Sequence, residues 1–332
     1  MTSGTTTPVL RPGDLAELRA AVLDTSGPLA VAGAGTAVAW GGRLGPVDAV
    51  LDTTALTGVI THNPGDMTVA VRAGTPLRAL HDELGAHGQH VSLDAARIAE
   101  GATVGGLLAT ADAGPAALVH GSLRDLVIGV TLVLADGTVA QSGGHVIKNV
   151  AGYDLAKVVH GSYGTLAVVA EVVLRLHPVP KASITVELPC ALADAAVAAA
   201  RVLGGPGEPA ALEWTSDDVL LLRLEGTEAA LDARAERVRK VLGAGAVAAG
   251  GDPWARHAEL TRGTPDAATL RIGVRPSRLP AVLAALPSTA VTAGLGTGVA
   301  TVTVAAAAVA EAHQTVHAAG GTSTLRARPH DS

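Results

Sequence analysis

The chain is nearly devoid of aromatic side chains. Among its 332 residues it has no phenylalanine, two tyrosines and three tryptophans, although 48% of the residues are hydrophobic. Valine, leucine, isoleucine and alanine must therefore fill the interior, and such a core leaves flat space for a planar ligand. Cys190 is the single cysteine, which excludes an internal disulfide and a cysteine-ligated iron–sulfur cluster within this chain. This usage suits a reducing cytoplasm.

Excess positive charge and long apolar runs are also lacking. The 24 Lys and Arg residues against 30 Asp and Glu give a formal net charge of −6, so nothing draws the chain over long range to nucleic acid or to an anionic membrane. The opening MTSGTTTPVLRPGD lacks the pattern of a signal peptide, and Gly, Asp or Thr interrupts the longest apolar runs. We expect a cytoplasmic protein without a transmembrane segment or nucleic-acid partner, or one peripheral to the membrane through its partners.

Glycine, in contrast, is abundant. The chain has 40 glycines, well above the usual share of roughly 7%. After Pro178 alanine-rich helical patterns alternate with short strand patterns, and no fixed-period repeat is visible. The length and this change of texture predict two α+β domains, residues 1–180 and 181–332. In the first, Asp136-Gly137 between two apolar runs predicts a β-hairpin.

Three glycine-rich segments of the first domain are candidates for ligand binding. The first, AVAGAGTAVAWGG from Ala30 to Gly42, places Gly33, Ala34, Gly35 and Thr36 at the end of a predicted strand. Backbone amides at such a point can converge on an anion and form a phosphate-binding nest. The segment lacks the Gly-Lys-Thr/Ser of a Walker loop and the third glycine of the Rossmann motif. A turn with a purely structural role is the alternative.

The second and third segments carry similar features. EGATVGGLLATADAGP, from Glu100 to Pro115, has Gly105-Gly106 at a helical start, where each glycine costs about 1 kcal/mol relative to alanine. Close approach of the backbone to a ligand would explain that cost, and close helix packing is the alternative. GGHVIKNVAGYDLAKVVHGSYGTLAVVAEVVLRLHP, ending at Pro178, combines glycines with Lys148 and both tyrosines before a buried strand. Its alternative reading is a set of solvated charges with a helix cap.

In this order the three segments resemble the FAD-binding domain of the vanillyl-alcohol oxidase family, the PCMH type, and within it the FAD-binding E subunits of glycolate oxidases. The resemblance extends from about Arg11 to Pro180 and includes GSLRDLVIGVTLVLADGTV. It implies an FAD domain of two α+β subdomains followed by a small, ferredoxin-like α+β cap. It also implies oxidation of CH–OH groups, with a small 2-hydroxy acid as substrate and a larger flavin subunit and an iron–sulfur subunit as partners.

The resemblance further implies site residues, position by position. The pyrophosphate loop would be residues 33–37, and Val168 would make main-chain contacts at the adenine end. Lys148 is our candidate for electrostatic stabilisation of reduced flavin, and no catalytic base can be named. The implied cofactor-binding residues are Gly33, Ala34, Gly35, Thr36, Ala37, Asp94, Gly101, Thr103, Gly105, Gly106, Ala109, Thr110, Lys148 and Val168.

Departures from the family pattern qualify this reading. Relatives that attach flavin covalently use a His or Cys, and the first segment has neither, so we expect FAD to be held noncovalently. His313 and His317 have the spacing of a helical metal pair, but no third ligand accompanies them, so we expect no metal site. A noncatalytic assembly subunit and a stand-alone FAD-dependent alcohol or sugar oxidase stay open as alternatives.

Overall fold

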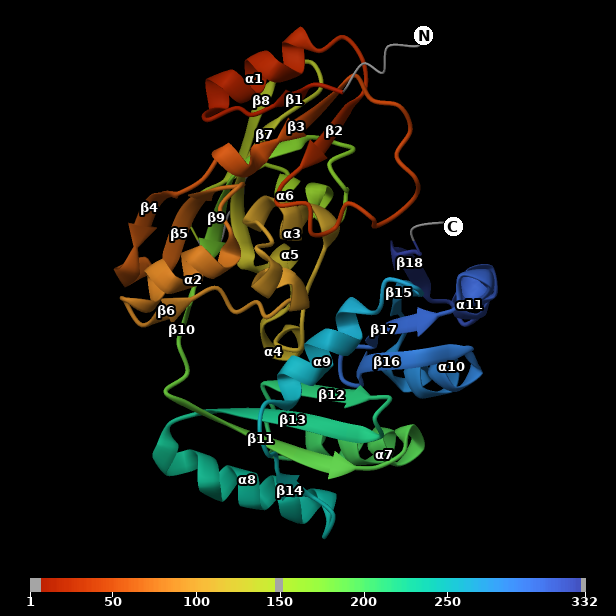
Figure 1. Cartoon of the computed structure of the whole chain (residues 1–332). Coiled ribbons are helices and arrows are strands. Elements are labelled where there is room, and N and C mark those ends of the chain that lie inside the picture. Colours follow the sequence, from red (N-terminus) through yellow and green to blue (C-terminus); the bar gives the residue numbers. More distant parts are fainter. Residues whose placement is uncertain (1–6, 147–151, 330–332) are drawn as a thin grey trace. The chain divides into compact units, whose positions relative to one another are not determined.

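The computed structural model describes residues 7–146 and 152–329, which divide into two units (Figure 1). The first unit comprises the chain up to Val38, Arg43–Ala113 and His120–Val179. Besides the chain from Pro180 onward, the second unit includes the short segments Ala39–Gly42 and Gly114–Val119. Both short segments lie before residue 180 in the sequence.

One layer of the first unit is a three-stranded parallel sheet in the order β1-β3-β2, accompanied by α1 (Figure 1). The helix starts after Asp14, whose carboxylate accepts a hydrogen bond from the Glu17 amide at 2.8 Å. Leu18 and Val22 on its inner face are buried in a small core. The elements are β1 (Val9–Leu10), α1 (Leu15–Asp24), β2 (Leu29–Ala32) and β3 (Ala49–Asp52).

The other layer is a five-stranded antiparallel sheet in the order β4-β5-β9-β7-β8. The predicted hairpin is present, since β7 and β8 pair across a turn in which Gly137 has φ +75°. Helices α2, α3, α5 and α6 contribute leucines and valines to its core. The elements of this stretch of the chain are β4 (Val59–Asn63), β5 (Thr68–Arg72), α2 (Leu77–Gly85), β6 (Gln89–His90), α3 (Val104–Thr110), α4 (Ala117–His120), α5 (Leu123–Leu126), β7 (Val127–Val133), β8 (Val139–Gly143), α6 (Leu155–Val159), β9 (Val168–Arg175) and β10 (His177–Pro178). Of these, β6 and β10 pair with each other in a separate two-stranded sheet, and residues 117–119 of α4 belong to the second unit.

The second unit contains one eight-stranded antiparallel sheet in the order β14-β11-β13-β12-β16-β17-β15-β18. Each half of it is a βαββαβ motif with ferredoxin-like strand order, and the halves join where Trp214 on β12 pairs with Ala293 on β16. The cap is thus ferredoxin-like as expected, but it holds two such motifs. Its elements are β11 (Ala182–Pro189), α7 (Leu192–Leu203), β12 (Ala211–Thr215), β13 (Val219–Gly226), α8 (Glu228–Leu242), β14 (Val247–Ala248), α9 (Pro253–Arg262), β15 (Ala268–Gly273), α10 (Leu279–Ala285), β16 (Ser288–Gly294), β17 (Val299–Val304), α11 (Val309–Ala318) and β18 (Thr322–Ala327).

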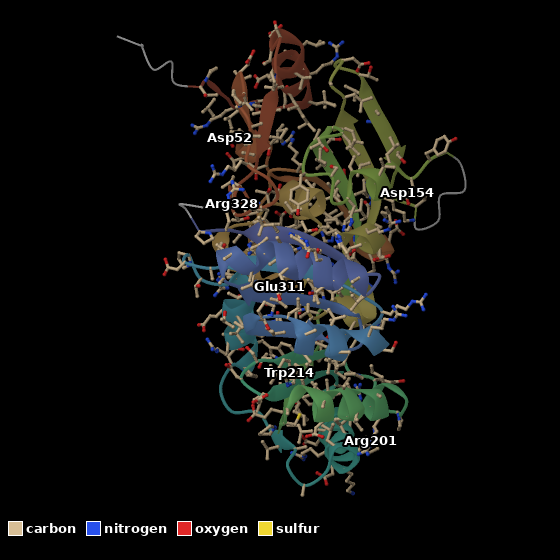
Figure 2. The ribbon with its side chains drawn as sticks, turned by 90° about the vertical axis from the view of Figure 1, so that its right-hand side faces the viewer. Asp52, Asp154, Arg201, Trp214, Glu311 and Arg328 are labelled. Carbon is tan, nitrogen blue, oxygen red and sulfur yellow. The ribbon has the colours of Figure 1, made fainter. Side chains whose placement is uncertain are left out.

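The two faces of this sheet differ in chemistry. Alternate strand residues pack with α7, α8, α10 and α11 in a mainly aliphatic core that includes Trp214, which is labelled in Figure 2. The opposite face is polar where α9 lies on it: the Trp254 indole donates to the Thr185 hydroxyl at 2.8 Å, and buried His257 lies 3.3 Å from Glu213. Helix α9 is therefore attached by polar contacts, while the other four helices are held by aliphatic packing.

No helix in the described ranges has both the length and the apolar composition needed to cross a membrane.

Acid should destabilise the first unit through His177. Burial, followed by the positive charges of His120, Arg175 and His90, lowers the pKa of His177 to about 4. The unfolded chain takes up a proton near pH 6.5 and the folded chain only near 4, so this group removes stability as the pH falls between those values. We expect the free energy of unfolding to fall by roughly 1 to 2 kcal/mol, after allowing for screening of this half-exposed ring.

Urea unfolding at pH 7 and pH 4.5 measures this loss of stability. His177→Gln should lose less stability between the two pH values, and an equal loss in both proteins would refute the assignment.

Candidate functional site

The first glycine-rich segment leaves β2 and turns directly against the start of α3. A Cβ atom built on Gly33 would lie 2.5 Å from the Thr103 Oγ1 atom, so a side chain at residue 33 would displace that hydroxyl. Gly35 has φ +77°, a conformation that favours glycine. The turn therefore requires glycine at two positions, for close approach at one and for its backbone angles at the other.

Several backbone amides of this loop are not used in hydrogen bonds with other backbone groups in the part of the chain that the structure describes. Within the described residues, the amides of Ala34, Gly35, Thr36 and Ala37 donate no backbone hydrogen bond, and the loop's own bond runs from the Val38 amide to the Gly35 carbonyl at 3.3 Å. Ala34 and Gly35 are exposed, and Thr36 and Ala37 are half-buried. Successive uncommitted amides at the end of a strand are the donor set that a diphosphate requires.

The second segment forms α3 and packs against the end of β5. The Thr103 hydroxyl caps the helix by accepting from the Gly106 amide at 3.2 Å. The Gly105 amide donates to the Ala73 carbonyl at 2.8 Å, and a Cβ on Gly105 would lie 2.8 Å from that of Ala73. The cost of glycine at residue 105 is therefore explained by close packing within the protein, which is the structural alternative considered for this segment.

Hydrogen bonds join the second segment to the third. The Tyr163 amide donates to the Ala109 carbonyl at 2.8 Å, and the Gly161 amide donates to the Leu108 carbonyl at 3.1 Å. The third segment in turn reaches the part of the first segment that lies in β2, because a Cβ on Gly164 would lie 3.3 Å from that of Val31. The first segment thus meets the second at Gly33, the second meets the third at Ala109, and the third meets β2 at Gly164. The structure brings all three together.

The remaining predicted residues have varied surroundings. Thr110 uses its hydroxyl within α3, donating to the Gly106 carbonyl at 2.8 Å. Gly101 ends the 3-10 turn η3 (Ala96–Glu100) with φ +86°, and half-buried Asp94 precedes that turn. Val168 opens β9, and its buried side chain belongs to the small core beside α1, so only its main chain could face a ligand. Lys148 lies outside the described residues.

Sequence reasoning missed a buried ion pair beside these segments. The Arg97 Nη1 atom lies 3.8 Å from the Asp112 Oδ2 atom, with side-chain exposures of 6% and 2%. Asp112 stands in the quoted stretch ATADAGP, but nothing in the order of the residues links it to an arginine fifteen positions earlier. Only the fold of the intervening glycine-rich stretch brings the two charges together.

Histidines and acids do not gather into a metal centre in the part of the chain that the structure describes, since no group of three or more potential ligands is present. His313 and His317 instead both contact the Ser323 hydroxyl, His313 Nδ1 closely and His317 Nε2 at 3.3 Å.

The three segments fit FAD in both halves of its chemistry. The uncommitted amides of residues 34–37 suit the diphosphate, and no His or Cys in that loop could attach flavin covalently. Apolar side chains on or beside the same segments are exposed, namely Val31 at 36%, Tyr163 at 37% and Leu166 at 56%. Exposed apolar groups on the segments that carry uncommitted amides are what a planar, partly apolar dinucleotide would cover.

Comparisons with known proteins agree with this geometry. Residues 7–143 match the family model described as "FAD binding domain". The chain is 34% identical over 186 residues to glycolate oxidase subunit GlcE of Escherichia coli (strain K12), covering 56% of this chain and 53% of that protein. It is 36% identical over 174 residues to a D-lactate dehydrogenase of Archaeoglobus fulgidus, covering 51% of this chain and 38% of that protein. Glycolate oxidase subunit GlcD of Bacillus subtilis (strain 168) is 36% identical over 126 residues, which are 36% of this chain and 26% of that protein.

Solved structures extend the likeness to the fold of both units. An alkyldihydroxyacetonephosphate synthase superposes with a TM-score of 0.68 at 17% identity, covering 96% of this chain and 73% of that protein. At that identity the match shows the fold alone. The chain spans about half of the E. coli relative and less of the other two curated relatives named above. The match of residues 7–143 to the FAD-binding domain model agrees with the resemblance seen in the sequence and supports FAD as the ligand of that part of the chain.

Proposed function

We propose that this chain is a noncovalent FAD-dependent oxidoreductase that oxidises the CH–OH group of a small 2-hydroxy acid such as glycolate. The observation that carries the proposal is the meeting of three glycine-rich segments beside four uncommitted backbone amides. Relatives named for glycolate and D-lactate oxidation support the substrate class.

In this proposal the chain's own residues bind and orient the cofactor. The amides of residues 34–37 hold the diphosphate, and each charge-assisted hydrogen bond contributes roughly 1.5 to 3 kcal/mol. Gly101, Thr103, Gly105, Gly106, Ala109 and Thr110 form the wall along the ribityl chain and flavin, with Asp94 near it, and the main chain of Val168 contacts the adenine end. Lys148 retains the proposed role of stabilising reduced flavin. Bound FAD supplies two-electron redox chemistry.

We propose that the chain works in a complex. The E. coli and B. subtilis relatives are named as subunits of glycolate oxidase, which supports a larger flavin subunit as partner. Because Cys190 is the single cysteine, any iron–sulfur cluster in the electron path would belong to a further subunit. Such a complex would lie in the cytoplasm, or peripheral to the membrane through its partners.

A noncatalytic assembly subunit that keeps the FAD fold is the second candidate. It is favoured by the absence of a nameable catalytic base and of a metal-binding group among the described residues. A stand-alone alcohol or sugar oxidase would differ from both in consuming oxygen without any partner.

Spectroscopy of the purified chain separates these candidates. Protein isolated gently should be yellow, release FAD on denaturation, and lose its flavin absorbance under anaerobic addition of glycolate or D-lactate, alone or with co-purified subunits. Bound flavin that no hydroxy acid bleaches, even with the partners present, would indicate the assembly role. A folded chain that contains no FAD and binds none would contradict the proposal.

A substitution at Gly33 tests the loop directly. Gly33→Ala should weaken FAD binding roughly tenfold or more, because the new Cβ displaces Thr103 and shifts the amides that follow. Gly42→Ala is the matched control, since a Cβ there meets nothing within 4 Å. Titration of the apoprotein with FAD gives the affinities, and its melting temperature without FAD shows that both variants fold. Equal affinities in the two variants would remove this loop from the site.

A further inference from the structure

Arg97 and Asp112 form a buried ion pair that the proposed function does not use. The Arg97 Nη1 and Asp112 Oδ2 atoms are 3.8 Å apart, within ion-pair range but beyond hydrogen-bonding distance. A buried ion pair commonly adds little net stability, because desolvation of the two charges offsets their attraction. The position of the pair in the fold can therefore indicate a role other than stability.

That place is at the two ends of the second glycine-rich segment. Arg97 lies in η3, and its carbonyl accepts from the Ala102 amide at 3.2 Å, at the start of the segment. Asp112 follows α3, and its amide donates to the Leu107 carbonyl at 3.1 Å. The backbones of both charged residues are thus tied to the stretch of chain that forms the proposed wall along the flavin.

Charges fixed beside a redox cofactor change its affinity for electrons. Reduction adds negative charge to the cofactor, so a nearby cation favours it and a nearby anion opposes it, most strongly in a low-dielectric interior. We propose that Arg97 and Asp112 act as a charge pair that sets the reduction potential of bound FAD. Arg97 raises the potential and Asp112 lowers it. This inference rests on the proposed function.

Three variants test the inference through the midpoint potential, measured anaerobically against a reference dye. Asp112→Asn removes the negative charge and should raise the potential. Arg97→Met removes the positive charge and should lower it. Each should change the ratio of affinities for reduced and oxidised flavin about tenfold, which is about 30 mV for a two-electron couple. The double variant, neutral at both positions, should return close to the wild-type potential.

The double variant separates this role from a purely structural one. Asp217→Asn, which removes a partly exposed carboxylate paired with Arg256 on the second unit, is the control and should leave the potential unchanged. The inference would be overturned if the potentials of the two single variants shifted in the same direction or did not shift, or if the single variants lost FAD. Each of these results is expected of an ion pair that only stabilises the fold. Wild-type protein without FAD would instead refute the proposed function itself.

Discussion

The close approach of the first glycine-rich loop to the start of α3 is the constraint on which the site depends. With no side chain at residue 33, the loop leaves β2 in contact with the Thr103 hydroxyl, which in turn caps α3. The loop can then turn through Gly35 while the amides of residues 34–37 stay uncommitted. In the proposed site the same missing side chains make room for a dinucleotide, and diphosphate binding would offset the cost of the glycines.

The rest of the first unit keeps this contact in place. Gly105 packs on Ala73 at the end of β5, and the GSYGT turn is hydrogen-bonded to the end of α3 before the chain enters β9. Both strands are central in the five-stranded sheet. The loops of the proposed site are therefore attached to strands inside the sheet and not at its edges, a construction that holds a binding site rigid at its base.

Much of this could be predicted from the sequence, and the exceptions have physical causes. The Asp136-Gly137 hairpin and the three segments follow from local glycine chemistry, which the order of residues displays. The two ferredoxin-like motifs could not be predicted in this way, because they resemble each other in the order of their strands and not in their residues. Helix α9, which lies between the motifs in the sequence, also breaks any regular spacing between them. The Arg97–Asp112 pair was missed because only folding of the stretch between them creates the contact. Gly105 was assigned to the ligand, yet its neighbour in the structure is Ala73. The contact of Gly105 with FAD stays a prediction, as does the domain boundary at residue 180.

The central claim is that uncommitted backbone amides hold the diphosphate, and comparison of FAD with riboflavin tests it most directly. Calorimetric titration of the apoprotein should show FAD binding roughly 100-fold or more tightly than riboflavin, which has the same ring system without phosphate, and ADP should compete with FAD. Equal affinities for FAD and riboflavin, with no competition by ADP, would contradict the account.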